Sequence, residues 1–382
     1  MNENLKAYRR AVRTQMTVCG LLFFSFSFTY LYVFQRDVIE ALHFSLAHGM
    51  THYAPLPSAI VMSVVLILLR WATGAILGLK GRIRAFSYFP SFLILGALTD
   101  VGRGVYMSDY HTHWLWLLPL LLAVYSCIVL GVKNLLLTLQ VEDSRPFALL
   151  NSNVAIIILL SCMTVAIGNA DTVFHHEVAV EHHILAGEYD KALEAGSNSG
   201  ESSRTLTALR AYAMSRQGTM GEKLFEYPQL FKSEGLFFID DSLLTFRYTN
   251  DSIFALVGVH PADNKLTPEF LRRVCYDGSA KYTALDYYFS SLLLEKRLGT
   301  FADAVSDLVF DADSLSKHYK EALAMYQTQH PDAEPFLTDS TMLMRYAGYK
   351  AALDNLKLHP ETLRDVRSEF GKTWWWYVSF QQ

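Results

Sequence analysis

Charged side chains are scarce in the first 170 residues of this chain. Of its 382 residues, residues 1–170 hold 12 Lys or Arg and 7 Asp or Glu, whereas residues 171–382 hold 21 and 30. So few charges exclude an ordinary water-exposed surface for the first part, and the change in composition predicts two domains, 1–170 and 171–382. The acidic balance of the second part argues against nucleic-acid binding, which requires clustered positive charge.

Cysteine is also scarce, which excludes a fold held together by many disulfides. Cys19, Cys127 and Cys162 lie in apolar runs, and Cys275 is alone in residues 171–382, so no disulfide can form within that part. Free cysteine usually packs as a small apolar residue. The first apolar run lacks a small-residue cleavage site, and further runs follow it, so we expect no removable signal peptide.

Common catalytic motifs are absent: the sequence has no G-x-S-x-G, P-loop, G-x-G-x-x-G or H-E-x-x-H pattern. Histidines gather between His175 and His183, but no two of them are three or four residues apart, as zinc ligands on one helix should be. Solvated or interfacial histidines are the favoured interpretation. The alternative, a metal site, would need other ligands such as His111 or His113. We expect no catalytic residue, metal ion or cofactor.

Long apolar runs are abundant in the first part. A membrane-spanning helix needs ~20 mostly apolar residues, and five runs predict spans at residues 16–34, 57–79, 86–105, 113–132 and 150–169. The third is the weakest, because it contains Asp100 and Arg103. The sequence therefore predicts an all-α protein that begins with a bundle of about five transmembrane helices in the lipid bilayer.

The loops between these spans differ in charge. The N-terminus, the loop after the second span and the segment after the fourth carry nine Lys or Arg, against two in the alternate loops. Basic loops stay in the cytoplasm, so we expect a cytoplasmic N-terminus in the inner (cytoplasmic) membrane and a periplasmic domain after residue 170. A third segment that only re-enters the membrane would move that domain to the cytoplasm, but the alternation of basic loops argues against this.

Charges inside the predicted spans mark candidate binding residues. Arg70 lies near the middle of the second span and Asp100 in the outward half of the third. Charges at such depths cost at least ~2.5–3.5 kcal/mol on insertion scales, so they usually pair or line a polar path. The favoured interpretation is a structural pair, Arg70 with Asp100 or Asp100 with Arg103. A proton or ion path is the alternative.

The second part has the apolar periodicity of packed helices. The spacing of glycine, aromatic residue and alanine in a tetratricopeptide-repeat turn occurs twice, at Gly187, Tyr189 and Ala192 and at Gly299, Phe301 and Ala304. A less regular copy follows the helix predicted at 205–217, and a further helical pair is predicted at 317–327 and 342–356. Residues 226–278, with a β-like stretch at Leu236–Ile239, break the period as either an insertion or a degenerate pair.

Stacked helical repeats leave a concave surface that usually binds peptides or protein segments. We therefore favour a binding scaffold over plain support of the membrane part. Trp374, Trp375 and Trp376 near the C-terminus are further candidate binding residues. Three adjacent residues point in different directions on a helix, so we expect some of these side chains to be packed and some exposed. Packing against the last repeat is favoured, and contact with a partner or the membrane interface is the alternative.

Aspartate followed by a hydroxyl residue and then an apolar residue or threonine occurs five times after residue 170 and not before it. The hydroxyl residues are Thr172, Ser242, Ser252, Ser314 and Ser340. The pattern is similar to the periplasmic O-glycosylation motif of the Bacteroidota. It agrees with a periplasmic location of the second part.

Several features together resemble a known family. They are the basic N-terminus, the apolar spans and the segments Ile184–Leu193, Glu226–Gln229, Tyr287–Lys296 and Thr373–Tyr377. The combination resembles a family of uncharacterised Bacteroidota membrane proteins, known only as a domain of unknown function. The resemblance implies an inner-membrane protein with a repeat-like helical domain, and it supplies no catalytic residues.

The sequence thus favours a non-enzymatic inner-membrane scaffold whose periplasmic helical-repeat domain binds a protein or peptide partner. The alternative is an enzyme or accessory subunit that processes envelope polysaccharide or a lipid-linked substrate. Arg70, Asp100 and the histidines motivate that alternative. A third class, transport, would need a polar path through the bundle.

Overall fold

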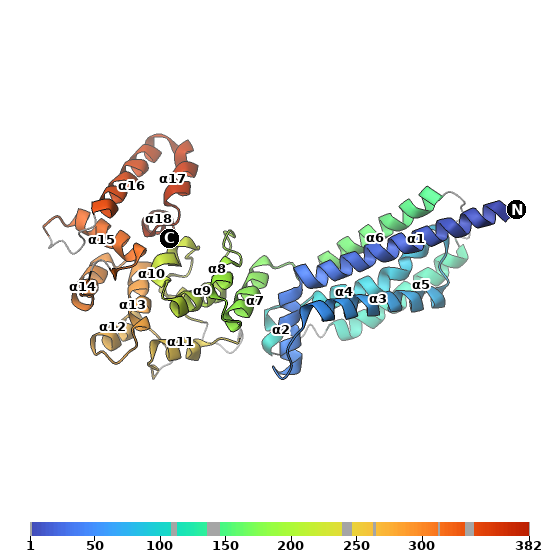
Figure 1. Cartoon of the computed structure of the whole chain (residues 1–382), viewed down its shortest axis with the longest axis horizontal. Coiled ribbons are helices and arrows are strands. Elements are labelled where there is room, and N and C mark those ends of the chain that lie inside the picture. Colours follow the sequence, from blue (N-terminus) through green and yellow to red (C-terminus); the bar gives the residue numbers. More distant parts are fainter. Residues whose placement is uncertain are drawn as a thin grey trace. The chain divides into compact units, whose positions relative to one another are not determined.

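The structure is a computed structural model, and it describes residues 2–107, 113–135, 146–238, 247–262, 265–311, 314–332 and 340–381. Within these residues the chain is helical and has no strand (Figure 1). The chain divides into two compact units, Met1–His175 and His176–Gln382. The division falls inside α7 (Thr172–Leu185).

The first unit is a bundle of long helices. Its helices before α7 are α1 (Asn2–Thr29), α2 (Arg36–Ala47), α3 (Pro55–Leu77), α4 (Phe89–Thr99), α5 (Trp114–Leu135) and α6 (Pro146–Ile167). One π-helical turn, Tyr30–Phe34, extends α1.

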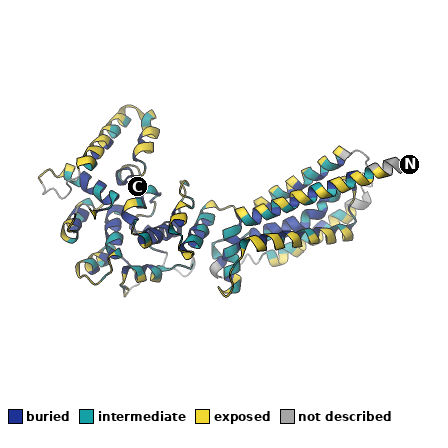
Figure 2. Cartoon of the chain, in the orientation of Figure 1, coloured by how far each residue is buried: buried dark blue, intermediate teal, exposed yellow. Residues whose placement is uncertain are grey.

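Four helices of this unit are long and apolar enough to cross a membrane. Within the described residues they are Tyr8–Phe34, Pro55–Leu77, Trp114–Gly131 and Phe147–Ile167. Large apolar side chains such as Trp71, Ile76 and Leu115 are exposed on these helices, and exposed residues follow the helices along the bundle (Figure 2). An apolar surface of this extent is unfavourable in water, and lipid would cover it.

The third predicted span, residues 86–105, is not one continuous helix. A 3₁₀ segment, Gly81–Tyr88, leads into α4, which has only 11 residues, and a second 3₁₀ segment, Arg103–Met107, follows. Pro90 lies in the first turn of α4. Proline favours a helix start there, because it has no N–H to donate to a preceding turn.

Hydrogen bonds hold the segment Gly81–Thr99 against α6 along its length. In chain order they join the Asn153 side chain to the backbone of Gly81 and Ala85, Thr164 Oγ1 to the Phe92 carbonyl, and the Asn169 N–H to the Thr99 carbonyl. Asn153 is near the start of α6 and Asn169 lies just after its end. The segment and α6 therefore run side by side in the same direction.

Aromatic side chains connect α1 to the same segment. The ring of Phe23 on α1 is fully buried, 5.0 Å from the ring of Tyr88 and 4.9 Å from that of Phe92. Farther along, the hydroxyl groups of Tyr30 and Thr99 are 3.3 Å apart. The interior of the bundle is thus aromatic with a few hydroxyl groups, and α1 also runs in the direction of α6.

The second unit is a set of shorter helices. After α7 they are α8 (Tyr189–Glu194), α9 (Arg204–Gln217), α10 (Met220–Lys223), α11 (Asn250–Val257), α12 (Pro268–Tyr276), α13 (Thr283–Leu294), α14 (Leu298–Leu308), α15 (Lys317–Gln329), α16 (Ser340–Leu358), α17 (Leu363–Phe370) and α18 (Trp374–Phe380). Region 226–278 contains α11 and α12. The described part of the expected β-like stretch, Leu236–Phe238, forms no strand.

Four of these helices, α7, α9, α12 and α13, end in the same turn. Gly187, Gly218, Gly278 and Lys296 have left-handed φ angles of 73°, 68°, 64° and 56°. Each donates its N–H to the carbonyl three residues earlier, and the next residue donates to the carbonyl five residues before it, the pair of bonds that closes a helix in a Schellman motif. Gly187 thus serves as the predicted turn glycine.

The predicted position of the last of these turns was wrong. Gly299 is the second residue of α14, and Lys296 takes the left-handed position three residues earlier. A lysine in this conformation costs about 1–2 kcal/mol relative to glycine. The sequence therefore predicted the turn at the nearby glycine, Gly299. The packing of α13 against α14 instead fixes where the turn occurs.

The C-terminal helix α18 is buried in the second unit. Trp374, Trp375 and Trp376 are 1%, 1% and 8% exposed. Thr373 caps the helix, because its hydroxyl accepts a hydrogen bond from the Trp376 N–H at 3.2 Å. All three indoles are buried, whereas the sequence predicted that some of them would be exposed. Their burial supports packing over contact with a partner.

Candidate ligand-binding groove

An open groove of about 490 Å³ lies on the second unit. Three segments that are distant in sequence form it: the end of α9, the middle of α11 and the start of α13. Its lining residues are Tyr212, Arg216, Ser252, Ala255, Leu256, Lys281, Tyr282 and Thr283.

Helix α9 forms one wall of the groove. Its residues from Thr205 to Ser215 are buried, which holds the helix rigidly in the unit. Arg216, at its exposed end, hydrogen-bonds to the Tyr212 hydroxyl and lies 5.8 Å from the ring centroid of Tyr189. Tyr189 was predicted only as a repeat-turn residue, and here it helps to position a groove cation.

The opposite wall joins the end of α11 to the start of α13. The Lys281 N–H donates to the Val257 carbonyl at 2.8 Å, Lys281 Nζ donates to the Ala255 carbonyl at 2.8 Å, and Thr283 Oγ1 donates to the Leu256 carbonyl at 2.6 Å. These bonds satisfy carbonyl groups that a helix end leaves free. The positive charge of Lys281 also interacts favourably with the partial negative charge at the C-terminal end of α11.

Glycine is required where these two elements meet. Gly258 has a φ of +83°, and a Cβ atom added to it would lie 2.7 Å from Lys281 Cγ. Any larger residue would be strained in its backbone and would displace the Lys281 stem. Gly258 therefore allows Lys281 to lie along the end of α11.

The groove is electropositive. Arg216 and Lys281 are cationic, and none of its lining residues is acidic. Burial raises the pKa of Tyr212, and burial followed by its tyrosine neighbour raises the pKa of adjacent Tyr248 to about 12. Both phenols therefore stay protonated near neutral pH. The groove presents cations and hydroxyl donors, a combination that suits a carboxylate ligand.

The candidate residues of the membrane part do not form the expected pair of Arg70 with Asp100. Arg70 is 7% exposed, and its guanidinium lies 4.8 Å from the ring centroid of Tyr88. Among the residues that the structure describes, Arg70 forms no salt bridge. Its partner is thus an aromatic ring on the 3₁₀ segment.

Asp100 and Arg103 contact side chains from neighbouring helix ends. The Asp100 carboxylate accepts a hydrogen bond from Trp114 Nε1 at 2.8 Å and lies 3.7 Å from His113 Nε2. Arg103 forms a salt bridge with Asp171, at the start of α7. Both sets of contacts join connecting segments to helix ends. They are therefore consistent with structural roles for Asp100 and Arg103.

Acidic groups of the histidine-rich helix α7 are buried and bonded. Glu177 and Glu181 are 0% and 1% exposed, and they accept hydrogen bonds from the Ser203 hydroxyl and the Arg247 N–H. His183 Nδ1 lies 3.1 Å from a Glu188 oxygen. These contacts give the acidic groups structural roles in the second unit.

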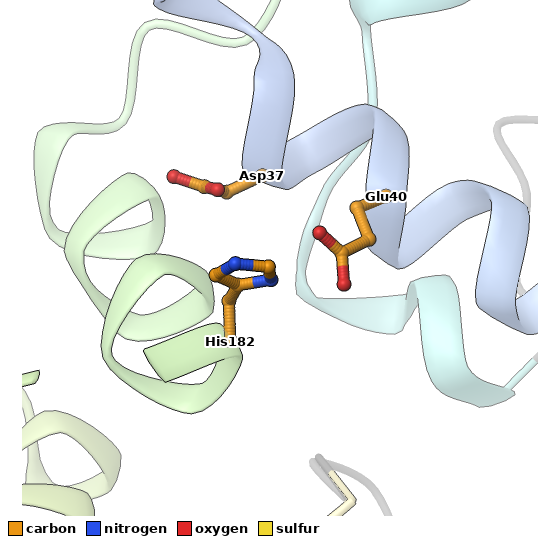
Figure 3. Close-up of side chains that lie close together, drawn as sticks. All are labelled: Asp37, Glu40 and His182. Carbon is orange, nitrogen blue, oxygen red and sulfur yellow. The ribbon is translucent and has the colours of Figure 1, made fainter. Parts of the chain in front are cut away.

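Potential metal ligands also occur on α2 and α7. Asp37 and Glu40 lie on α2 of the first unit, and His182 lies on α7 of the second (Figure 3). Each side chain offers an atom that a metal ion could bind. The three come from both units, and no metal site is assigned to them.

The remaining predicted residues lie in various environments. Ala192, Phe301 and Ala304, which the sequence predicted as repeat positions, are buried. Of the proposed glycosylation residues, Thr172, Ser314 and Ser340 are exposed, whereas Ser252 caps α11 and lines the groove. Ser242 lies outside the described residues.

Comparison with protein families covers nearly the whole chain. A family model described as a family of unknown function (DUF6057) matches residues 8–265 and 262–381. The chain belongs to this family. The two matches include both units and every residue of the groove. No curated protein and no solved structure matches the chain.

Sequence reasoning missed the groove of this DUF6057 protein. Tyr212, Arg216 and Lys281 are unremarkable in sequence, and the region between them was interpreted only as a break in the repeat period. A faint signal was available, because Arg216 follows Tyr212 by four residues, about one helical turn, and Lys281 directly precedes Tyr282. Their proximity depends on how α9, α11 and α13 pack.

Proposed function

We propose that this chain is a non-enzymatic scaffold of the inner membrane whose periplasmic domain binds an acidic segment of a protein or peptide. The groove carries the proposal: Arg216 and Lys281 lie in one cavity that has no acidic lining residue. A ligand carboxylate would form charge-assisted hydrogen bonds with them. Lys281 Nζ uses one donor on Ala255 and keeps two for a ligand. Tyr282, 80% exposed, adds aromatic surface, which binding sites favour.

Shared turns support a tetratricopeptide-like repeat for the second unit. The turns at Gly187, Gly218 and Lys296 have the same hydrogen bonds, and the first two are 31 residues apart, close to the 34 residues of that repeat. Such repeats stack into extended surfaces that bind peptides. A peptide ligand fits this architecture better than a small metabolite does, because the groove is open and formed by separate hairpins.

Five membrane crossings are proposed for the first unit: the four long helices and the segment Gly81–Thr99. The 8 residues of the 3₁₀ segment and the 11 of α4 span about 32 Å at ~2.0 and ~1.5 Å per residue. This length fits a hydrocarbon layer of ~30 Å. The contacts of the segment with α6, from Asn153 to Asn169, support a complete crossing.

An odd number of crossings puts the second unit across the membrane from the N-terminus. Helix α5 supports the alternation, because Trp114 bonds to Asp100 near its start and the Tyr125 hydroxyl bonds to the Phe86 carbonyl farther along. It thus runs opposite to the preceding segment. The nine basic residues on the N-terminal side, against two on the other, favour a cytoplasmic N-terminus.

Reporter fusions test this topology. Alkaline phosphatase, which is active only outside the cytoplasm, is expected to be active when fused after Gln382 and inactive when fused after Lys133. A green fluorescent protein fusion should show the reverse pattern, because the two ends lie on opposite sides. A fluorescent, phosphatase-negative C-terminus would contradict the five crossings and place the groove in the cytoplasm.

Charge reversal tests the groove. Titrating the purified full chain in detergent with two labelled peptides, one rich in Asp and Glu and one in which Lys replaces them, should give binding of the acidic peptide only. Arg216→Glu or Lys281→Glu is expected to weaken it about 10- to 100-fold, because each removes a charge-assisted hydrogen bond of ~1.5–3 kcal/mol. Fluorescence anisotropy measures the change.

Lys350→Glu is the matched control, because it reverses an exposed charge on α16, outside the groove lining. Binding by this variant should equal that of the unmodified chain. Equal binding of both peptides, or unchanged binding by Arg216→Glu and Lys281→Glu, would refute an acidic ligand in this groove.

A further inference from the structure

Arg70 is a buried cation in the membrane bundle. It lies on α3, is 7% exposed, and its Nε atom has no hydrogen-bond partner in the described part of the chain. A guanidinium group carries five N–H donors and is always charged. A charge at this depth is costly unless something compensates it, so an intramembrane arginine usually marks a site.

A second arginine lies close to the first. Arg84 lies on the 3₁₀ segment Gly81–Tyr88, four residues before Tyr88, whose ring centroid is 4.8 Å from the Arg70 guanidinium. The electrostatic interaction between the two arginines is unfavourable. Neither arginine forms a salt bridge within the described residues. Two like charges in a poorly hydrated place repel strongly. An anion between or beside them would remove the repulsion and fill their unused donors.

Elements around the arginines form a polar cluster within an apolar bundle. Arg70 comes from α3, whereas Arg84, Ser87 and Tyr88 come from the 3₁₀ segment Gly81–Tyr88. The Ser87 hydroxyl is buried and has no hydrogen-bond partner among the described residues. The Tyr88 ring, 2% exposed, fixes the Arg70 guanidinium by a cation–π contact. This cluster offers donors and no carboxylate.

The depth of the cluster suits a lipid headgroup. Arg70 precedes Leu77, the last residue of α3, by seven residues, or about 10 Å along the helix axis. Arg84 follows just after that helix end. Long arginine side chains reach from such positions toward the membrane surface. The cluster belongs to the end of the bundle that carries most of the basic residues of residues 1–170.

We propose that Arg70 and Arg84 bind a phosphate group, carried by an anionic lipid headgroup or free in solution. Phosphate oxygens match the planar donor fork of arginine and form short, charge-assisted hydrogen bonds with it. Basic pockets between transmembrane helices on the cytoplasmic side bind such headgroups. This site lies in the first unit and is separate from the proposed peptide groove, so either one can fail alone.

Ligand titration of the purified full chain in an uncharged detergent tests the site. The probes are dioctanoyl phosphatidylglycerol, dioctanoyl phosphatidylcholine and inorganic phosphate, and native mass spectrometry measures the bound fraction. Phosphatidylglycerol is expected to bind in preference to phosphatidylcholine. Arg70→Gln and Arg84→Gln should each weaken that binding at least about tenfold, as expected for the loss of a charge-assisted hydrogen bond.

Arg10→Gln is the control, because it removes an exposed arginine of α1 and should leave binding unchanged. If inorganic phosphate binds and both glutamine variants weaken that binding, the site exists and takes a soluble ligand. If only phosphatidylglycerol binds, the site exists and takes a lipid. Equal binding of the two lipids together with no phosphate binding, or unchanged binding by both variants, overturns the proposal. If Arg70→Gln does not fold, binding by Arg84→Gln decides between these outcomes, because Arg84 is only half-buried.

Discussion

Replacing Trp375 by alanine is expected to destabilise the second unit by about 3–5 kcal/mol, the range for deleting a large buried aromatic side chain. Trp375 is 1% exposed. Its ring lies 5.7 Å from that of Tyr349 and 5.2 Å from that of Tyr346, and its Nε1 donates to the Glu321 carbonyl at 2.7 Å. The substitution therefore opens a cavity and leaves a buried carbonyl without its donor.

The destabilisation should extend to α13 and α15, because α18 is hydrogen-bonded to both. Trp374 donates its N–H to Glu321 Oε2 at 2.8 Å and its indole N–H to the Leu293 carbonyl at 3.1 Å. Tyr377 donates its hydroxyl to the Leu294 carbonyl at 2.6 Å. One short helix thus connects the end of α13 to α15, and its loss should loosen both.

Hydrogen exchange of the full chain in detergent measures this effect. Amides of α13 and α15 in Trp375→Ala should exchange roughly 100-fold to a few thousand-fold faster than in the unmodified chain, because each 1.4 kcal/mol corresponds to about tenfold. Phe310→Ala is the control, since Phe310 is fully exposed and its removal should leave the rates unchanged. Equal rates in Trp375→Ala would show that α18 does not stabilise its neighbours.

Asn153→Leu is expected to destabilise the first unit by about 2–4 kcal/mol, because each buried polar group left without a partner costs roughly 1–3 kcal/mol. Asn153 is 0% exposed. Its Oδ1 accepts from the Ala85 N–H at 2.7 Å, and its Nδ2 donates to the carbonyls of Gly81 and Leu149 at 3.1 and 2.8 Å. Leucine is close in size and replaces none of these bonds. Lipid cannot replace them either.

Limited trypsin digestion in detergent detects the local part of this change. The substitution should release the 3₁₀ segment and speed cleavage after Arg82 and Arg84. Thermal unfolding of the same sample reports the global part. Ser152→Ala is the matched control, since among the described residues the Ser152 hydroxyl bonds only within its own helix, to the Ala148 carbonyl. A cleavage rate and a midpoint equal to those of Ser152→Ala would contradict the anchoring role of Asn153.

Hydropathy located the long apolar helices well and the third predicted span poorly. Four of the five predicted segments overlap long apolar helices, because an apolar run of that length has few alternatives to a helix. Residues 86–105 instead form α4 with 3₁₀ segments on either side. Asn153, almost 70 residues away in sequence, anchors the first of these segments, and no window of hydropathy contains that contact.

Turn chemistry was predictable where glycine provides it. Gly187 adopts the left-handed conformation that its turn requires, whereas Lys296 does so against its own preference. The first follows from the absence of a side chain. Lys296 adopts the left-handed conformation because burial of Phe301 and Ala304 fixes the position of α14. The backbone at Lys296 must then turn at this point.

By itself, the sequence determined the all-helical class, the apolar N-terminal part and the helical second part, because these depend on composition and periodicity along short stretches of chain. Only the tertiary structure decided that Arg70 contacts the ring of Tyr88 rather than Asp100, and that Arg216 and Lys281 share a groove. Such sites depend on contacts between segments far apart in sequence. Their pairing follows from the packing of whole helices, and no local pattern records it.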